Sequence, residues 1–146
     1  VPAFNTVPLI STQAEKVLSM LRRTASSARD PARMDDESLV RHIYDTHRLH
    51  QSVTFDLAEL AGLIAAGMKM DRERYGTQHP EFAENPIAEM RYGLSVVGSN
   101  PEYQRRYEAF VKPMVYGDVL PWDDAFGVFE AVARQTLDHI EQHRLI

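Results

Sequence analysis

Apolar residues recur every three or four positions along most of the chain. The spacing is that of amphipathic helices, with apolar positions on the inner face and polar positions on the outer face. Ala14, Val17, Leu18 and Leu21 form one such face. The pattern predicts six helices, which run from Ser11 or Thr12 to between Arg23 and Ser26, and then over about 36–51, 56–74, 86–97, 101–116 and 121–143.

Prolines, glycines and polar clusters punctuate this pattern. Pro86 and Pro101 stand in the first turns of two predicted helices, and Gly117 is a candidate C-cap. Residues 24–36 and 76–85 are predicted as loops. The first ten residues hold two prolines and read as a short extended segment. The fold class is therefore all-α, a bundle of about six helices in a single domain over 1–146.

Composition narrows the functional classes. The 146 residues include no cysteine, which excludes disulfides and thiolate metal sites. No apolar run reaches the ~18 residues that a membrane span needs, and the first residues do not resemble a signal peptide. The formal net charge of −5 argues against indiscriminate nucleic-acid binding. We expect a cytoplasmic protein and, because Val1 is not methionine, a piece of a longer one.

Two predicted helices carry polar side chains that point away from their apolar faces. At 100° per residue, Arg41, Asp45 and Arg48 lie together on the outer side of the second helix. Lys16 points away from the apolar face of the first. The simple interpretation is a surface ion pair between Arg41 and Asp45, four residues apart.

These residues also carry a resemblance to a known family. Glu15-Lys16-Val17-Leu18-Ser19-Met20-Leu21, followed by Arg41-His42-Ile43-Tyr44-Asp45, resembles the C-terminal half of AbiEii-like nucleotidyltransferases. These are type IV toxins within the polymerase-β-like superfamily. Less specific matches continue to the end of the chain, through Gly67-Met68-Lys69-Met70, Asn85-Pro86, Met114-Val115-Tyr116-Gly117 and Phe126 to Phe129.

The resemblance implies roles for individual residues. Lys16 matches a lysine that faces the nucleotide triphosphate, where an ammonium group suits phosphate oxygens. Asp45 matches an acidic residue that positions or deprotonates the attacking group. Arg41 and Arg48 would flank it as phosphate or carboxylate partners. In the full-length parent the family implies an NTP substrate, Mg²⁺, an RNA acceptor and an antitoxin partner.

The magnesium site of this superfamily is missing from the chain. It needs a Gly-Ser turn followed by Asp-x-Asp, and no Asp-x-Asp occurs here. Gly98-Ser99 joins two predicted helices, and the pairs Asp35-Asp36 and Asp123-Asp124 read better as acids at helix N-termini. We therefore expect the catalytic domain upstream of residue 1, no metal or cofactor on this chain, and no transfer by the chain alone.

Two other functional classes stay open. Arg41 and His47 also fit the Arg-x(4–6)-His motif of HEPN-type ribonucleases, which cleave RNA without metal. The two residues lie about 120° apart on their helix, with His47 facing inward. The third alternative is a non-catalytic helical interaction module. His139 and His143 stand one turn apart as in helical zinc pairs, but a third ligand is not evident, and a solvated helix is the simpler interpretation.

Overall fold

Seven α-helices and one 3₁₀ turn make up the described part of the chain. In this computed structural model, residues 8–113 and 120–146 are described. The helices are α1 (Leu9–Arg29), α2 (Arg41–Ser52), α3 (Leu57–Tyr75), α4 (Pro80–Glu84), α5 (Pro86–Ser99), α6 (Pro101–Val111) and α7 (Trp122–Gln142), with η1 (Glu37–Val40) before α2. No strand occurs within these residues. The all-α prediction is confirmed.

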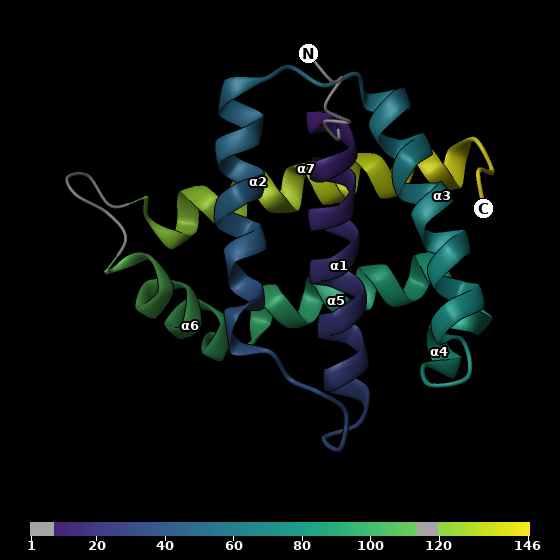
Figure 1. The fold of residues 1–146 in the computed structure, drawn as a ribbon, viewed down its shortest axis with the longest axis horizontal. Helices are drawn as coiled ribbons and strands as arrows, with labels where there is room; N and C mark the ends of the chain where they lie inside the picture. Colours follow the sequence, from purple (N-terminus) through teal and green to yellow (C-terminus); the bar gives the residue numbers. More distant parts are fainter. Residues whose placement is uncertain (1–7, 114–119) are drawn as a thin grey trace, which may run out of the picture.

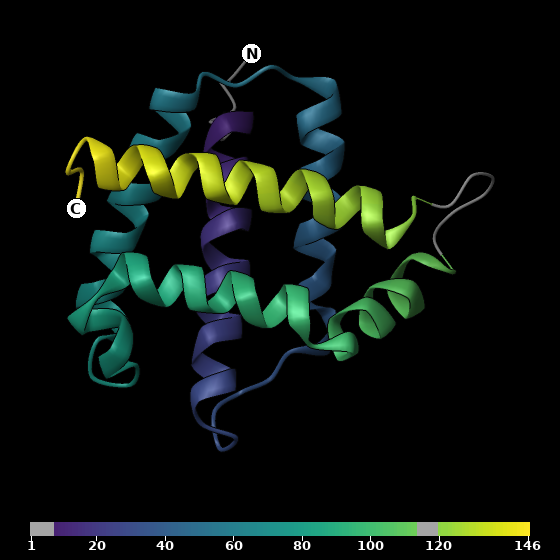
Figure 2. The ribbon, with the colours of Figure 1, turned by 180° about the vertical axis from the view of Figure 1, so that it is seen from behind.

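The helices form two layers that cross each other. Helices α1, α2 and α3 lie side by side, with α1 in the middle (Figure 1). Behind them α5 and α7 run across the first layer, as the view from behind shows (Figure 2). Helix α1 contacts α2, α3 and α5, while α7 packs against both α2 and α3. The outer side of the first layer is left open by this arrangement.

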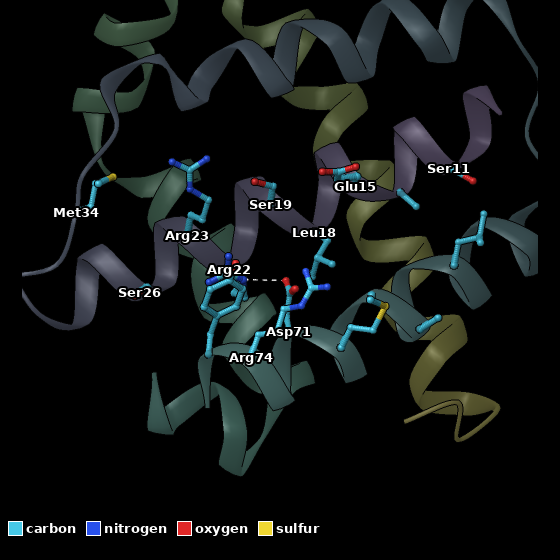
Figure 3. Close-up of a pocket in the computed structure, with 16 residues that line it drawn as sticks. Ser11, Glu15, Leu18, Ser19, Arg22, Arg23, Ser26, Met34, Asp71 and Arg74 are labelled. Carbon is cyan, nitrogen blue, oxygen red and sulfur yellow. Dashed lines mark hydrogen bonds and ion pairs between the residues drawn. The ribbon is translucent and has the colours of Figure 1, made fainter. Parts of the chain in front are cut away.

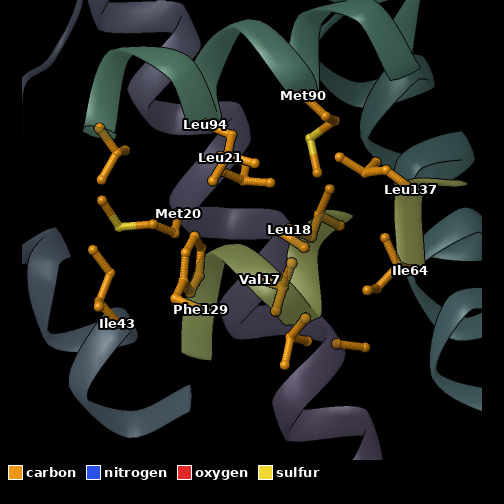
Figure 4. Packing of buried hydrophobic residues seen from close by; sticks show 14 of the residues in the cluster. Val17, Leu18, Met20, Leu21, Ile43, Ile64, Met90, Leu94, Phe129 and Leu137 are labelled. Carbon is orange, nitrogen blue, oxygen red and sulfur yellow. The ribbon is translucent and has the colours of Figure 1, made fainter. Parts of the chain in front are cut away.

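The core lies between the two layers and is built around the inner face of α1. Val17, Met20 and Leu21 of α1 have no exposed surface. Figure 4 shows their neighbours, which come from every long helix except α6. These neighbours include Ile43 of α2, Ile64 of α3, Met90 and Leu94 of α5, and Phe129 and Leu137 of α7.

Helix α1 is longer than its sequence pattern predicts, at both ends. It begins at Leu9 after Pro8, so the predicted extended segment is wrong for Leu9 and Ile10, and residues 1–7 lie outside the described residues. It continues to Arg29 through residues predicted as a loop. Thr24 and Ala25 are fully buried there, so tertiary packing overrides the weak local helix signal. The predicted helix start at Ser11 or Thr12 is likewise wrong, because Pro8 is the N-cap.

The remaining boundaries follow the sequence closely, with two differences. Asp56 caps α3, Asn85 caps α5 and Asn100 caps α6, each accepting from a backbone N–H. Helix α4 was predicted as loop; it begins at Pro80 and buries Phe82 against the core. The predicted 36–51 helix opens as η1, and the predicted end of α6 with its Gly117 cap lies outside the described residues.

No helix of the described part is long and apolar enough to cross a membrane.

One glycine sets the distance between the two layers. A Cβ on Gly93 of α5 would overlap the backbone carbonyl of Leu21 in α1. Backbone cannot move aside as a flexible side chain can, so the layers touch at this point only because residue 93 has no side chain. Gly127 of α7, in contrast, has open space around its Cα.

We therefore predict opposite effects for alanine at these two glycines. Gly93→Ala should lower the free energy of unfolding by about 2 kcal/mol, because it forces α5 off α1. Gly127→Ala should raise it by about 0.5–1 kcal/mol, because alanine favours the helix. Urea unfolding followed by circular dichroism measures both. Equal effects of the two variants would contradict the close approach of α1 and α5.

Candidate functional site

Lys16 and Asp45 meet on the open side of the first layer. The Nζ atom of Lys16 donates a hydrogen bond to Oδ2 of Asp45 at 2.9 Å, across 29 positions of sequence. The exposed fractions of the two side chains are 22% and 36%, so the pair is partly protected from solvent but still accessible to a ligand. The inner faces of α1 and α2 both pack into the core. Lys16 and Asp45 therefore both point toward the seam between the two helices.

The two arginines predicted beside Asp45 lie differently from one another. Arg41 is exposed at the start of α2, and no ion pair within the described residues joins it to Asp45. Arg48 is also exposed, and its guanidinium lies over the ring of Tyr44 at 5.6 Å. The expected surface pair between Arg41 and Asp45 is thus replaced by a bond from Asp45 to Lys16 on another helix.

His42 belongs to the same corner of the molecule, although the sequence carried no usable signal for it. It lies on α2, one turn before Asp45, and is half-buried. Burial, together with the positive charges of Lys16 and Arg41, lowers the pKa of His42 to about 4. The imidazole is therefore neutral at physiological pH, and the positive charge of this corner resides on Lys16 and the arginines.

Two further cations of α1 bind carboxylates on neighbouring elements. Arg22 bonds Asp71 of α3 at 2.9 Å, and Arg23 bonds Asp36, the residue before η1, at 3.1 Å. Together with the Lys16–Asp45 pair, these ion pairs connect the outer side of α1 to α3 on one side and to α2 and the residue before η1 on the other. Between α1 and α3 the same side opens into a groove of about 780 Å³ (Figure 3).

Asp35 and Asp36 have structural partners, and Asp123 and Asp124 lie at a helix N-terminus, as the sequence indicated. Asp36 caps η1 by accepting from the backbone N–H of Ser38. Asp35 forms a two-bond ion pair with Arg106 of α6. Asp123 and Asp124 lie in the first turn of α7. Within the described residues, none of these four acids belongs to a group of three or more metal-ligating side chains.

The ribonuclease pair is not brought together. His47 is buried on the inner side of α2, with an exposed fraction of 6%, whereas Arg41 is exposed on the outer side. Burial lowers the pKa of His47. An imidazole enclosed by the core cannot reach an RNA strand that contacts Arg41, so this geometry disfavours the HEPN-type mechanism.

The terminal histidines stack on each other. The ring centroids of His139 and His143 lie 4.1 Å apart on the last turns of α7. Among the residues that the structure describes, they are not part of any group of three or more metal-ligating side chains. A two-residue stack on an exposed helix end gives no closed zinc site.

A buried ionic cluster joins the end of α1 to α4 and α5, and the sequence pattern did not reveal it. Nε2 of His79 lies 2.6 Å from Oε2 of Glu89, and both side chains are at most 3% exposed. Arg29 donates to both carboxylate oxygens of Glu89, the shorter bond being 2.8 Å. Burial alone would raise the pKa of Glu89, but the bonds from Arg29 and His79 outweigh it and hold the pKa below the usual value.

The cluster contains three groups that are close enough for a metal ion. Ligand atoms of His79, Glu81 and Glu89 lie within 4.8 Å of one another. However, Glu89 is engaged by Arg29, and Glu81 lies 3.4 Å from Arg33. Two guanidinium groups already balance the two carboxylates, so a divalent cation would add uncompensated positive charge. We interpret the cluster as a set of ion pairs that holds the end of α1 against α4 and α5, and not as a metal site.

A conservative change at Glu89 tests this interpretation. Glu89→Gln should lower the free energy of unfolding at pH 7 by about 2 kcal/mol, because charge-assisted hydrogen bonds are lost. A lowered pKa in the folded state means stabilisation above the unfolded pKa that disappears as the pH falls through the folded one. The difference from wild type should therefore shrink toward pH 3. Urea unfolding across this pH range measures it.

The exposed Glu141 offers a matched control. Glu141→Gln should change stability by less than about 0.5 kcal/mol at every pH, because exposed ion pairs contribute little. If Glu89→Gln lowered the free energy of unfolding by the same amount at every pH, the cluster would depend on the shape of the side chain and not on its charge.

The fold and the site together define a helical domain that presents a lysine–aspartate pair on its open side. Comparison with known protein families matches residues 1–128 to the family described as nucleotidyl transferase AbiEii toxin, type IV TA system. The chain belongs to this family. No curated protein and no solved structure matches the chain.

Proposed function

We propose that this chain is the helical half of a nucleotidyltransferase that transfers a nucleotide from an NTP to an RNA acceptor. Membership of the AbiEii family supports the class of reaction. The observation that carries the proposal is the 2.9 Å contact between Lys16 and Asp45, made by two separate helices on the open side of the domain.

In this proposal Lys16 binds the triphosphate. An ammonium group has three N–H donors, and Asp45 accepts one of them. The other two make no hydrogen bond to the part of the chain that the structure describes, so they can bind phosphate oxygens, where the negative charge grows as the leaving group departs. His42 stays neutral beside Lys16 and so does not repel or replace this charge.

Asp45 acts on the attacking hydroxyl of the acceptor. Its Oδ2 is bonded to Lys16, and Oδ1 makes no hydrogen bond to the described residues. Oδ1 can therefore accept the hydroxyl proton while the oxygen attacks the α-phosphorus. The new P–O bond forms as the bond between the α- and β-phosphates breaks, and pyrophosphate leaves. Arg41 and Arg48, both exposed near this seam, supply positive charge for phosphate groups.

Residues 1–146 do not supply the magnesium site of the superfamily. The sequence has no Asp-x-Asp, and the one group of metal-ligating side chains in the described part is neutralised by Arg29 and Arg33. We therefore propose that an upstream catalytic unit holds Mg²⁺ and completes the site. An antitoxin is the expected regulatory partner, because the family is a type IV toxin–antitoxin system.

Transfer by the full-length parent should depend on both members of the pair. Lys16→Ala and Asp45→Asn should each lower kcat at least ~100-fold, as for other groups that stabilise or deprotonate in the transition state. Incorporation of label from an α-³²P-NTP into RNA measures this. Arg134→Ala, which removes an exposed ion pair on α7, should leave the rate unchanged.

Stability measurements on the same variants separate chemistry from folding. The pair is partly exposed, so either change should alter the free energy of unfolding by no more than about 1 kcal/mol. Normal transfer rates in both Lys16→Ala and Asp45→Asn would overturn the assignment of this site.

The isolated chain should transfer no nucleotide. Residues 1–146, incubated with the four NTPs, Mg²⁺ and total RNA, should leave the RNA unlabelled, because the carboxylates that hold the metal are absent. The full-length parent under the same conditions is the control. Label incorporated by the isolated chain would show that the metal-binding half is not needed.

A further inference from the structure

We infer that Tyr44 and Arg48 of α2 form a platform that binds an unpaired nucleobase of the acceptor RNA, close to the end that carries the attacking hydroxyl. The inference rests on the proposed function, because it names the part of the acceptor that the same site recognises. The platform stands on the same helix as Asp45, the residue that acts on this hydroxyl in the proposal.

Arg48 differs from the other arginines that lie over a tyrosine ring. The described residues contain four such pairs, and in three of them the arginine also binds a carboxylate: Arg22 pairs with Asp71, Arg29 with Glu89, and Arg106 with Asp35. Arg48, which lies over Tyr44, forms no ion pair within residues 8–113 and 120–146. Its guanidinium is also the farthest from its ring, at 5.6 Å. The donors of Arg48 are therefore available to a ligand.

The ring of Tyr44 is held in place by packing but is not covered. Tyr44 is partly buried at the edge of the core. Its ring meets that of Phe110 of α6 edge to face, with centroids 6.3 Å apart and planes at 73°. Helix α6 lies beyond α2, on the side away from α1 (Figure 1). A base can therefore stack on a ring whose orientation is already fixed, which keeps the entropy lost on binding small.

The outer arc of α2 leads from this ring to the carboxylate. At 100° per residue, Arg48 and Arg41 lie about 40° and about 60° round the helix from Tyr44, and Asp45 lies about 100° from it. The two arginines are therefore between the ring, on the side of α6, and Asp45, on the side of α1. The order of carboxylate, guanidinium groups and ring matches the order of hydroxyl, phosphates and base in a strand of RNA.

The length of this arc fits a short stretch of RNA. Two side chains about 100° apart on a helix of about 10–12 Å diameter lie roughly 8 Å from each other. Stacked nucleotides repeat at about 3.4 Å along one strand, so roughly two nucleotides span this distance. We therefore expect the bound base to belong to one of the last three nucleotides of the acceptor.

The charge of the arc favours a polyanion. Arg41 and Arg48 form no ion pair within the part of the chain that the structure describes, and Asp45, the single acidic residue of α2, is bonded to Lys16. The unbalanced charge on this face is therefore positive, although the whole chain has a net charge of −5. Proteins bind single-stranded RNA by combining such charge with aromatic rings that stack on bases. Arg48 accordingly binds the phosphate beside the stacked base.

Equilibrium binding of RNA to the full-length protein, without NTP, tests the platform. The probe is a fluorescein-labelled single-stranded RNA of mixed sequence, and fluorescence anisotropy at fixed salt measures its affinity. Tyr44→Leu removes the ring but keeps an apolar side chain against the core, so it should weaken binding about tenfold, as expected for one base–aromatic stack. Tyr44→Phe keeps the ring and should bind severalfold more tightly than Tyr44→Leu.

Tyr92→Leu is the matched control. Tyr92 is also partly buried and lies under an arginine, Arg29, but it belongs to α5 in the other layer. This variant should bind RNA as the wild type does. Equal losses of affinity in Tyr44→Leu and Tyr92→Leu would attribute the effect to folding and overturn the platform.

An abasic RNA tests the contact in the unaltered protein, where folding is not in question. One abasic nucleotide is placed in turn at each of the last three positions of the probe. At one position the wild type should lose about tenfold in affinity, and Tyr44→Leu should lose nothing further there, because ring and base are the two halves of one contact. Losses that add independently at every position would contradict the stack.

The salt dependence of binding distinguishes the two members of the platform. Arg48→Gln removes one phosphate contact and should reduce the slope of log K against log[salt] by about 0.7. Tyr44→Leu should leave this slope unchanged, because the tyrosine is uncharged. Arg134→Gln, at an exposed ion pair of α7, is the control for loss of a positive charge elsewhere. An equal slope in Arg48→Gln and the wild type would remove Arg48 from the platform.

Transfer assays on the same proteins separate this inference from the proposed function. Tyr44→Leu should raise the KM for RNA and not the KM for NTP; a rise for NTP instead would assign the base to the donor nucleotide and overturn the acceptor platform. Normal RNA binding and normal transfer in Tyr44→Leu would overturn the platform and leave the transferase intact. Ring-dependent RNA binding by a protein that transfers no nucleotide would overturn the proposed function and leave the platform.

Discussion

The burial of one face of α1 is the constraint on which the rest of the structure depends. Val17, Met20 and Leu21 are fully enclosed between the two layers, and Gly93 lets α5 touch the backbone of α1 behind them. Because the inner face is held in this way, the opposite face cannot rotate. Lys16 and the arginines of α1 are therefore directed outward at fixed angles, toward carboxylates on either side.

The ion pairs of α1 have different surroundings and, we propose, different uses. Arg22 and Asp71 are both less than 20% exposed and help to hold α1 against α3. Lys16 and Asp45 are more accessible and lie on the seam with α2. A partly exposed pair contributes little to stability but remains available to a ligand. The buried cluster around Glu89 is the opposite case, in which charge is enclosed and satisfied within the fold.

The open side of the first layer unites the site and the groove. Both lie on the outer side of α1, and the groove leaves Met34 and Met70 exposed to water.

The sequence by itself determined the helical class, most helix boundaries and the pair of polar residues, because periodic burial and capping are local properties that each segment carries within it. Only the tertiary structure decided that Asp45 bonds Lys16 and not Arg41, that α1 continues through Thr24 and Ala25, and that His79, Glu89 and Arg29 form one cluster. These outcomes depend on contacts between residues as many as 60 positions apart. The 3.6-residue period shows which way a side chain points, but not which helix it will meet.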